Sequence, residues 1–193
     1  MIFETVVVTQ GGDGRFHVAP MGIREQGGLF VLAPFRPSTT LENLRATAQA
    51  VINMTDDVSI IAGCLTGRRE WPLVPVERVR GARLEGALSH FEAEVVRVEE
   101  DELRPRFFCK VVYEEMHRPF RGFNRAQAAV VEAAILVSRL HMLPPEKIER
   151  EIEYLSIAME KTAGEREWRA WSWLMEKIKE HSELGLDKAG GAV

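Results

Sequence analysis

The chain has 193 residues, of which 46% are hydrophobic and 28% charged, so it is long and apolar enough to bury a core in one domain, or in a main domain with an appendage. A formal net charge of −4 disfavours a broad nucleic-acid-binding surface, because binding to the phosphate backbone depends on clustered Lys and Arg. No apolar run approaches the roughly 20 residues of a membrane span, and the start, MIFETVVVTQ, lacks the features of a signal peptide. We therefore expect a soluble, cytoplasmic protein.

Short β-rich runs separated by turn signals fill the chain up to about residue 120. The predicted strands span residues 3–9, 16–23, 29–35, 50–54, 59–65, 91–98 and 107–113. One helix is predicted within this part, over residues 40–49. The first part of the chain is therefore predicted to be a β domain that opens with a meander.

After residue 120 the pattern becomes helical. The predicted helices span residues 124–142, 146–162 and 165–181. The last of them carries Trp168, Trp171 and Trp173, which we interpret as core or subunit-interface packing rather than as a ligand cage. The predicted organisation is a barrel domain over residues 1–122, a helical extension over 123–185 and a flexible tail over 186–193.

Several kinds of catalytic motif are absent from the sequence. There is no phosphate-binding glycine motif, no G-x-S-x-G and no H-E-x-x-H. The five histidines are dispersed, without the close spacing of a local metal site, so we predict no metal. Cys64 and Cys109 lie in separate apolar segments and are expected to be reduced core residues rather than a disulfide.

The segment PFRPSTTLENL, residues 34–44, joins a predicted strand to a predicted helix. Arg36 supplies a positive charge, and three hydroxyl residues follow where the helix begins, so this helix N-terminus suits a phosphate group. Thr39 and Glu42 also fit the capping-box pattern T-x-x-E, which explains the same residues without a ligand. On this segment alone, ordinary capping is the stronger interpretation.

Two other segments interrupt predicted strands. Pro20 cannot donate to a β-ladder and Gly22 has no side chain to pack, so this stretch permits close approach of a flat group. Asn53 and Thr55, two residues apart, face the same way on an extended chain and suit a polar ring edge, although on this segment alone a turn rich in Asn, Thr and Asp is the stronger interpretation. A flat ring with a polar rim and one phosphate describes FMN.

The order HVAPMGI, FRPSTTLENL and VINMTDD, followed by FNRAQAAVVEAAILVSRL, resembles an uncharacterised family, a domain of unknown function, within the flavin-reductase-like, FMN-binding split-barrel superfamily. The resemblance covers nearly the whole chain. It implies an antiparallel, six-stranded split β-barrel with Greek-key character and appended C-terminal helices, α+β overall, and a homodimer that binds FMN near its interface. Members of the family occur in methanogenic archaea and in bacteria with methanopterin-linked one-carbon metabolism.

The resemblance also implies candidate cofactor-binding residues. It places the isoalloxazine ring near Ala19, Pro20, Met21 and Gly22, and the phosphate and ribityl chain near Arg36, Ser38, Thr39, Thr40 and Asn43. Asn53, Thr55 and Asp57 match its N-x-T-x-D element. Asn124 and Arg125 are candidates for reaching FMN across the dimer, and the alternative is an N-cap and a solvated charge.

The expected function is that of an FMN-dependent oxidoreductase. It would pass reducing equivalents from a reduced nicotinamide or deazaflavin donor to a small substrate, with a pterin as one candidate. Flavin carries out hydride chemistry itself, so the sequence demands no catalytic protein residue and we name none. The alternatives are a non-catalytic flavin-binding or storage protein, or the same fold holding pyridoxal phosphate or haem.

Overall fold

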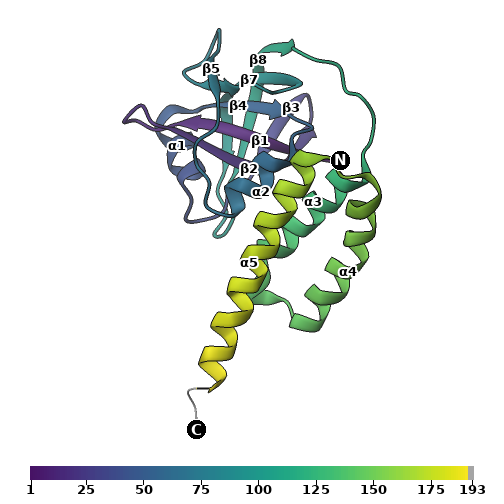
Figure 1. Ribbon diagram of the computed structural model, residues 1–193. Coiled ribbons are helices and arrows are strands. Elements are labelled where there is room, and N and C mark those ends of the chain that lie inside the picture. Colours follow the sequence, from purple (N-terminus) through teal and green to yellow (C-terminus); the bar gives the residue numbers. More distant parts are fainter. Residues whose placement is uncertain (191–193) are drawn as a thin grey trace. The chain divides into compact units, whose positions relative to one another are not determined.

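The computed structural model describes the backbone of residues 1–190 and the side chains of residues 1–183. Six strands form a closed barrel in the order β1-β2-β3-β8-β7-β4, and every neighbouring pair is antiparallel (Figure 1). The strands are β1 (Ile2–Gln10), β2 (Phe16–Gln26), β3 (Leu29–Leu32), β4 (Gln49–Met54), β7 (Ser89–Glu99) and β8 (Arg106–Met116). The predicted six-stranded antiparallel barrel is confirmed.

The barrel interior holds the core of this part of the chain. Alternate residues of the strands point inward, as Val7 and Ile52 do, and both are fully buried. Helix α1 (Thr39–Thr47) adds Leu41 and Leu44 to the same cluster. The helix predicted over residues 40–49 is therefore present, and its role is to complete the barrel core.

A two-stranded hairpin, β5 (Leu73–Pro75) and β6 (Ala82–Leu84), is inserted before β7 and was not predicted. Two buried side chains of the barrel bind its backbone. Asn53 Oδ1 accepts from the N–H of Leu84 at 2.9 Å, and the Glu92 carboxylate accepts three N–H groups from residues 77–79. These strands are too short to carry a pattern in the sequence, and polar side chains on other strands hold the insertion in place.

The structure explains why β2 contains Pro20 and Gly22. The ladder with β1 runs along the strand, but the ladder with β3 begins only at Arg24, so Pro20 and Gly22 lie where β3 does not pair with β2. Proline is tolerated at such an edge. A Cβ atom on Gly22 would lie 2.9 Å from Cγ2 of Ile2, so any larger residue there would force the Ile2 side chain to shift. Neither residue needs a ligand to account for it.

The second compact unit is helical and contains α2 (Val58–Leu65), α3 (Arg125–Val137), α4 (Pro145–Thr162) and α5 (Glu165–Gly190) (Figure 1). Helix α2 packs with α3 and α5, and α3 packs with α4. The region predicted as one helix over residues 124–142 is two elements: α3 ends at Val137, and a separate 3₁₀ turn spans Leu140–Met142. None of the helices within residues 1–190 is long and apolar enough to cross a membrane.

The strand predicted over residues 59–65 is wrong, because this segment is helix α2. Seven of its eight residues are buried, so the helix has no polar face to produce a period of 3.6. A short apolar run that is buried all round cannot be assigned to strand or helix from its pattern.

The two compact units are not consecutive along the chain. One comprises residues 1–56 and 69–120, and the other comprises 57–68 together with the chain from residue 121. The domain boundary predicted at residue 122 stays a prediction, and in the structure α2 belongs to the helical unit. Helix α5 extends through Gly190, so residues 186–190 of the predicted tail are helical, and residues 191–193 lie outside the described residues.

Candidate functional site

Helix α1 begins one residue earlier than the capping-box pattern implies. Ser38 is the N-cap, in extended conformation, and its side chain accepts from the N–H of Leu41 at 3.3 Å. The N–H of Glu42 donates to the Ser38 carbonyl at 3.1 Å. The predicted box between Thr39 and Glu42 is therefore wrong, because Thr39 is already the first helical residue.

The first turn of α1 has donors available for an anion. Among the described residues, no backbone or side-chain oxygen accepts from the N–H groups of Thr39 and Thr40. Unpaired N–H groups at a helix N-terminus carry partial positive charge and point outward along the axis. Together with the hydroxyls of Ser38 and Thr39, they fit a phosphate group.

Two arginines lie beside this helix start and share one carboxylate. The Arg36 guanidinium is paired with Glu100 and also donates to the carbonyl of Asp101 at 3.0 Å, while Arg45 contacts both Glu100 oxygens at 3.0 Å. Arg36, Ser38 and Arg45 line a groove of about 380 Å³. An anionic group already lies between the two guanidinium groups, so a phosphate would have to displace or share Glu100.

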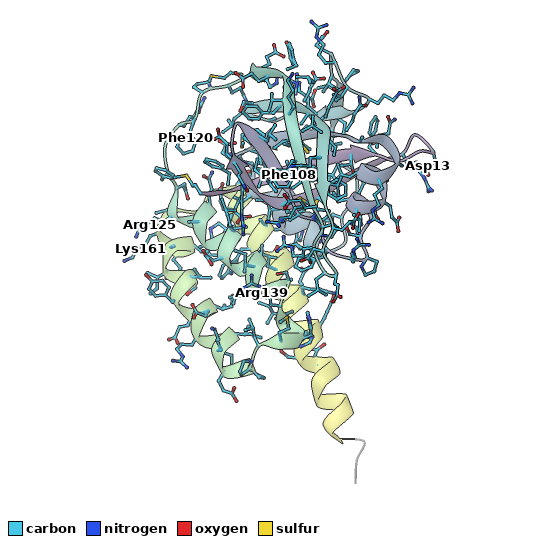
Figure 2. All side chains as sticks on the ribbon, turned by 180° about the vertical axis from the view of Figure 1, so that it is seen from behind. Asp13, Phe108, Phe120, Arg125, Arg139 and Lys161 are labelled. Carbon is cyan, nitrogen blue, oxygen red and sulfur yellow. The ribbon has the colours of Figure 1, made fainter. Side chains whose placement is uncertain are left out.

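A larger cavity, of about 570 Å³, lies where α1 faces the β1–β2 hairpin, and its size is in the range of small-ligand sites. It is lined by Gly11, Gly12, Asp13, Arg15, Phe16, His17, Thr39, Glu42, Asn43 and Ala46. Figure 2 shows Asp13 at the outer end of this hairpin. Burial, followed by the charge of Arg69, lowers the pKa of His17, so its imidazole is neutral at pH 7.

Two of the predicted ribityl or phosphate residues are buried beneath this site. Thr40 is 3% exposed, and Asn43 is 7% exposed and donates its amide to Thr9 Oγ1 at 3.0 Å. Asn43 also lines the larger cavity. The Asn43–Thr9 hydrogen bond joins α1 to β1.

The β2 residues assigned to the isoalloxazine ring, Ala19 to Gly22, are all partly exposed. Met21 packs against the barrel core, and its carbonyl accepts from the Thr5 hydroxyl at 2.8 Å. His17, two residues before Ala19 on the same strand, lines the larger cavity with Thr39 and Asn43. The structure therefore brings the start of β2 and the first turn of α1 to one cavity.

Asn53 has a structural role. It is fully buried, and its amide nitrogen donates to the carbonyls of Val6 and Val51 at 3.0 and 3.3 Å. Both N–H donors are thus used within the protein, and the carbonyl oxygen holds the β5–β6 hairpin. Thr55 is half-buried at the end of β4, and its predicted contact with a ligand stays a prediction.

Three further candidates belong to the helical unit. Asp57 caps α2, accepting from the N–H of Ser59 at 3.1 Å. Asn124 caps α3, accepting from Ala126 and Gln127, and its amide donates to the Thr162 carbonyl at 3.0 Å. The N-cap alternative for Asn124 is confirmed.

Arg125 is exposed, and Figure 2 shows it near Lys161, where the start of α3 meets the end of α4. Its predicted contact with FMN across a dimer, like that of Asn124, stays a prediction. Cys64 and Cys109 are both buried and form no disulfide, in agreement with the expectation that they are core residues. Burial raises the pKa of Cys109 to about 12, so its thiol is unreactive at neutral pH.

A group of possible metal ligands was not predicted from the sequence. His90 on β7, and Glu115 and His117 at the end of β8, each offer a ligand atom within 4.8 Å of the others. The motif Glu-x-His over residues 115–117 places both side chains on one face of an extended chain, and this was the available signal. The third residue, His90, lies 25 residues before Glu115 in the sequence, and only the pairing of β7 with β8 brings the two together.

Comparison with known proteins identifies the family. Residues 3–118 match the N-terminal domain of a protein of unknown function, DUF447, and residues 124–176 match the second DUF447 domain. The chain belongs to the DUF447 family. No curated protein matches it.

Solved structures show that the DUF447 barrel is shared more widely. An FMN-bound DUF447 protein from Methanosarcina mazei has a TM-score of 0.80 at 20% identity, covering 91% of this chain and 94% of its own. A split-barrel protein from Shewanella frigidimarina, assigned as a flavin reductase, has a TM-score of 0.54 at 13% identity and covers 64% of this chain and 74% of its own.

An NADH:FAD oxidoreductase from Streptomyces globisporus has a TM-score of 0.51 at 15% identity, covering 59% of this chain and 75% of its own. At these identities the similarity establishes the fold. The predicted flavin-reductase-like split barrel is therefore confirmed, as is the recognition of an uncharacterised family within it.

Proposed function

We propose that this DUF447 protein binds FMN and is an FMN-dependent oxidoreductase. The observation that carries the proposal is the first turn of α1. It has two N–H groups without protein acceptors, two hydroxyls, and the guanidinium groups of Arg36 and Arg45 beside it. This combination of helix dipole, hydroxyls and bidentate cations suits a terminal phosphate monoester.

The larger cavity supports a ligand bigger than phosphate alone. About 570 Å³ accommodates a ring system, and its lining runs from Thr39 on α1 to His17 on β2. An FMN-bound member of the family with the same fold supports the choice of FMN over other flat phosphate esters. Bound FMN supplies hydride transfer, and the protein contributes orientation and access.

The residues have distinct roles in this proposal. The α1 N-terminus, with Arg36 and Arg45, binds the phosphate, and release of Glu100 from the two guanidinium groups accompanies binding. The segment Ala19–Gly22 does not line this cavity; it is assigned to the ring because it matches the family's motif and follows His17, a lining residue, on β2. His17, neutral at pH 7, offers a hydrogen bond without adding charge next to the ring.

FMN binding is tested by titrating the flavin-free protein with FMN and following quenching of flavin fluorescence. The Arg36→Ala variant is expected to raise Kd by roughly 10- to 100-fold, because a charge-assisted hydrogen bond contributes about 1.5–3 kcal/mol. Arg139→Ala, which removes an exposed charge from the helical unit, is the matched control and should leave Kd unchanged. Equal Kd values for wild type and Arg36→Ala would reject the phosphate role of Arg36.

Catalysis is tested separately. The FMN-loaded protein is mixed anaerobically with NADH, NADPH or a reduced deazaflavin, and bleaching of the flavin absorbance is followed. Rapid reduction by one donor supports an oxidoreductase, and small acceptors, including oxidised pterins, are then screened. Tight FMN binding without reduction by any donor supports a flavin-binding or storage protein. A bound chromophore with the mass of pyridoxal phosphate or haem would overturn the FMN assignment.

We also propose a homodimer. The segment Ala19–Gly22, which is assigned to the ring, precedes the start of the β2–β3 ladder at Arg24, so β3 does not pair with this edge of β2. A second subunit covering this edge would bury both the strand and the ligand. Light scattering on the FMN-loaded protein measures the mass, and a monomer at all concentrations contradicts this part of the proposal.

A further inference from the structure

His90, Glu115 and His117 gather on one face of the β7–β8 ladder. His90 is paired directly with Glu115 across the two strands, and His117 follows two residues later. His90 is 2% exposed, whereas the side chains of His117 and Glu115 are 14% and 49% exposed. The cluster therefore begins in the protein interior and opens to solvent at Glu115.

The buried carboxylate of Glu92 lies beside the ring of His90. Glu92 is itself fixed, because its carboxylate accepts three backbone N–H groups at 2.6–2.9 Å. Its Oε1 lies 3.5 Å from Nε2 of His90, and that nitrogen has no hydrogen-bond partner of normal geometry. An acceptor-only carboxylate favours the tautomer with its proton on Nε2. Nδ1 of His90 then carries a lone pair and no proton.

This lone pair faces a second imidazole. Nδ1 of His90 lies 2.9 Å from Nε2 of His117, and Nδ1 of His117 lies 4.0 Å from a Glu115 carboxylate oxygen. The local charges comprise two carboxylates, Glu92 and Glu115, and the guanidinium of Arg83, which acts on His117. One cation thus offsets two anions, so an added positive ion is favoured here.

We propose that His90, His117 and Glu115 bind a divalent transition-metal ion of the Zn²⁺ class. Two imidazoles and one carboxylate are typical ligands for such ions, and solvent at the open side completes the coordination. Glu92 acts through His90, since a carboxylate behind a ligating histidine is a common way to orient its ring.

The separation of the two nitrogens is compatible with this role. In a tetrahedral site, metal–nitrogen bonds of about 2.0–2.1 Å place two ligating nitrogens about 3.3 Å apart, so the two rings need to separate by only about 0.4 Å from the present 2.9 Å. The ion takes the place of the hydrogen bond between the rings: the His117 proton moves from Nε2 to Nδ1, and the rings turn to direct both lone pairs at the ion. Because His90 is on β7 and the other ligands end β8, the ion fastens the end of this hairpin.

Zinc binding by the metal-free full-length protein tests the proposal, using competition with a chromophoric chelator. One equivalent is expected to bind, and the variants His117→Gln and Glu115→Gln are expected to weaken it at least tenfold. His141→Gln, which removes an exposed histidine elsewhere, is the control and should bind as the wild type does. Zinc should raise Tm in wild type and control but not in His117→Gln.

Two outcomes overturn the proposal. Either no zinc binds at roughly tenfold excess over protein, or the affinity is the same in His117→Gln as in the wild type, which places the ion elsewhere. Both variants change partly exposed residues, so they are expected to fold, and circular dichroism verifies this. Measurements with and without FMN keep the result independent of flavin binding.

Discussion

At the residue scale, Glu92 combines full burial with a charge. Burial alone would raise its pKa, but the hydrogen bonds from Glu77, Arg78 and Val79 outweigh it and lower the pKa, so the carboxylate stays ionised. We expect Glu92→Gln to lower the free energy of unfolding by about 2–4 kcal/mol, because an amide cannot accept all three N–H groups. Urea denaturation measures this. Glu114→Gln, at an exposed position of β8, should stay within about 0.5 kcal/mol of wild type.

His17 gives a prediction about pH. Its pKa in the folded protein lies below the ordinary 6.5, mainly through burial. The unfolded chain therefore binds more protons between the folded pKa and 6.5, and stability rises with pH across that window and is lost as pH falls through it. The difference in unfolding free energy between wild type and His17→Gln should increase with pH across this window. It is measured with a metal chelator in the buffer, so that bound metal ions do not contribute. A pKa at or above 6.5 by NMR titration would contradict it.

Individual polar residues were predictable where their role is local. Asn124 has its cap acceptors two and three residues away, so its sequence context was sufficient to raise the capping alternative. Asn53 has its partners on β1 and at Leu84, 31 residues away, and only the folded barrel reveals that its amide serves the backbone. Glu92 went unnoticed for the same reason.

At the scale of elements, the barrel strands were predictable because each buries one face. Alternation and β-branched residues located β1, β2, β4, β7 and β8 to within a few residues. Helix α2 was not, because burial on all sides removes the pattern. The start of α1 was placed within one residue, but Thr39 and Glu42 fit a capping pattern that the chain does not use.

The position of that cap is open to experiment. Ser38→Ala removes the side-chain acceptor of the Leu41 N–H and is expected to lower stability by about 1 kcal/mol. Thr39→Ala removes no such cap and should lower it by less than about 0.5 kcal/mol. Thermal unfolding without FMN separates the two, and a larger loss for Thr39→Ala would restore the capping box predicted from sequence.

At the scale of the whole molecule, the chain leaves the barrel unit after residue 56, forms α2 in the helical unit and returns at residue 69. A domain boundary placed at residue 122 from the sequence therefore separates α2 from its packing partners, α3 and α5. No pattern in the sequence marks the passage of the chain into the helical unit and back, because α2 is short and lies within the β-rich part of the chain.

A fragment comprising residues 1–122 tests this arrangement. It retains every barrel strand, but α2 loses α3 and α5, which exposes the apolar residues Val58, Ile60 and Ile61 that are at most 8% exposed in the whole protein. Exposure of several aliphatic side chains costs about 1.5–3 kcal/mol each. The fragment is therefore expected to bind a hydrophobic dye and to unfold at lower urea concentration than the full chain.

A fragment with Ile60→Gln and Ile61→Gln should bind less dye, which ties the effect to α2. If the original fragment unfolds like the full-length protein and binds no dye, the barrel is an independent domain and α2 is not part of the helical unit.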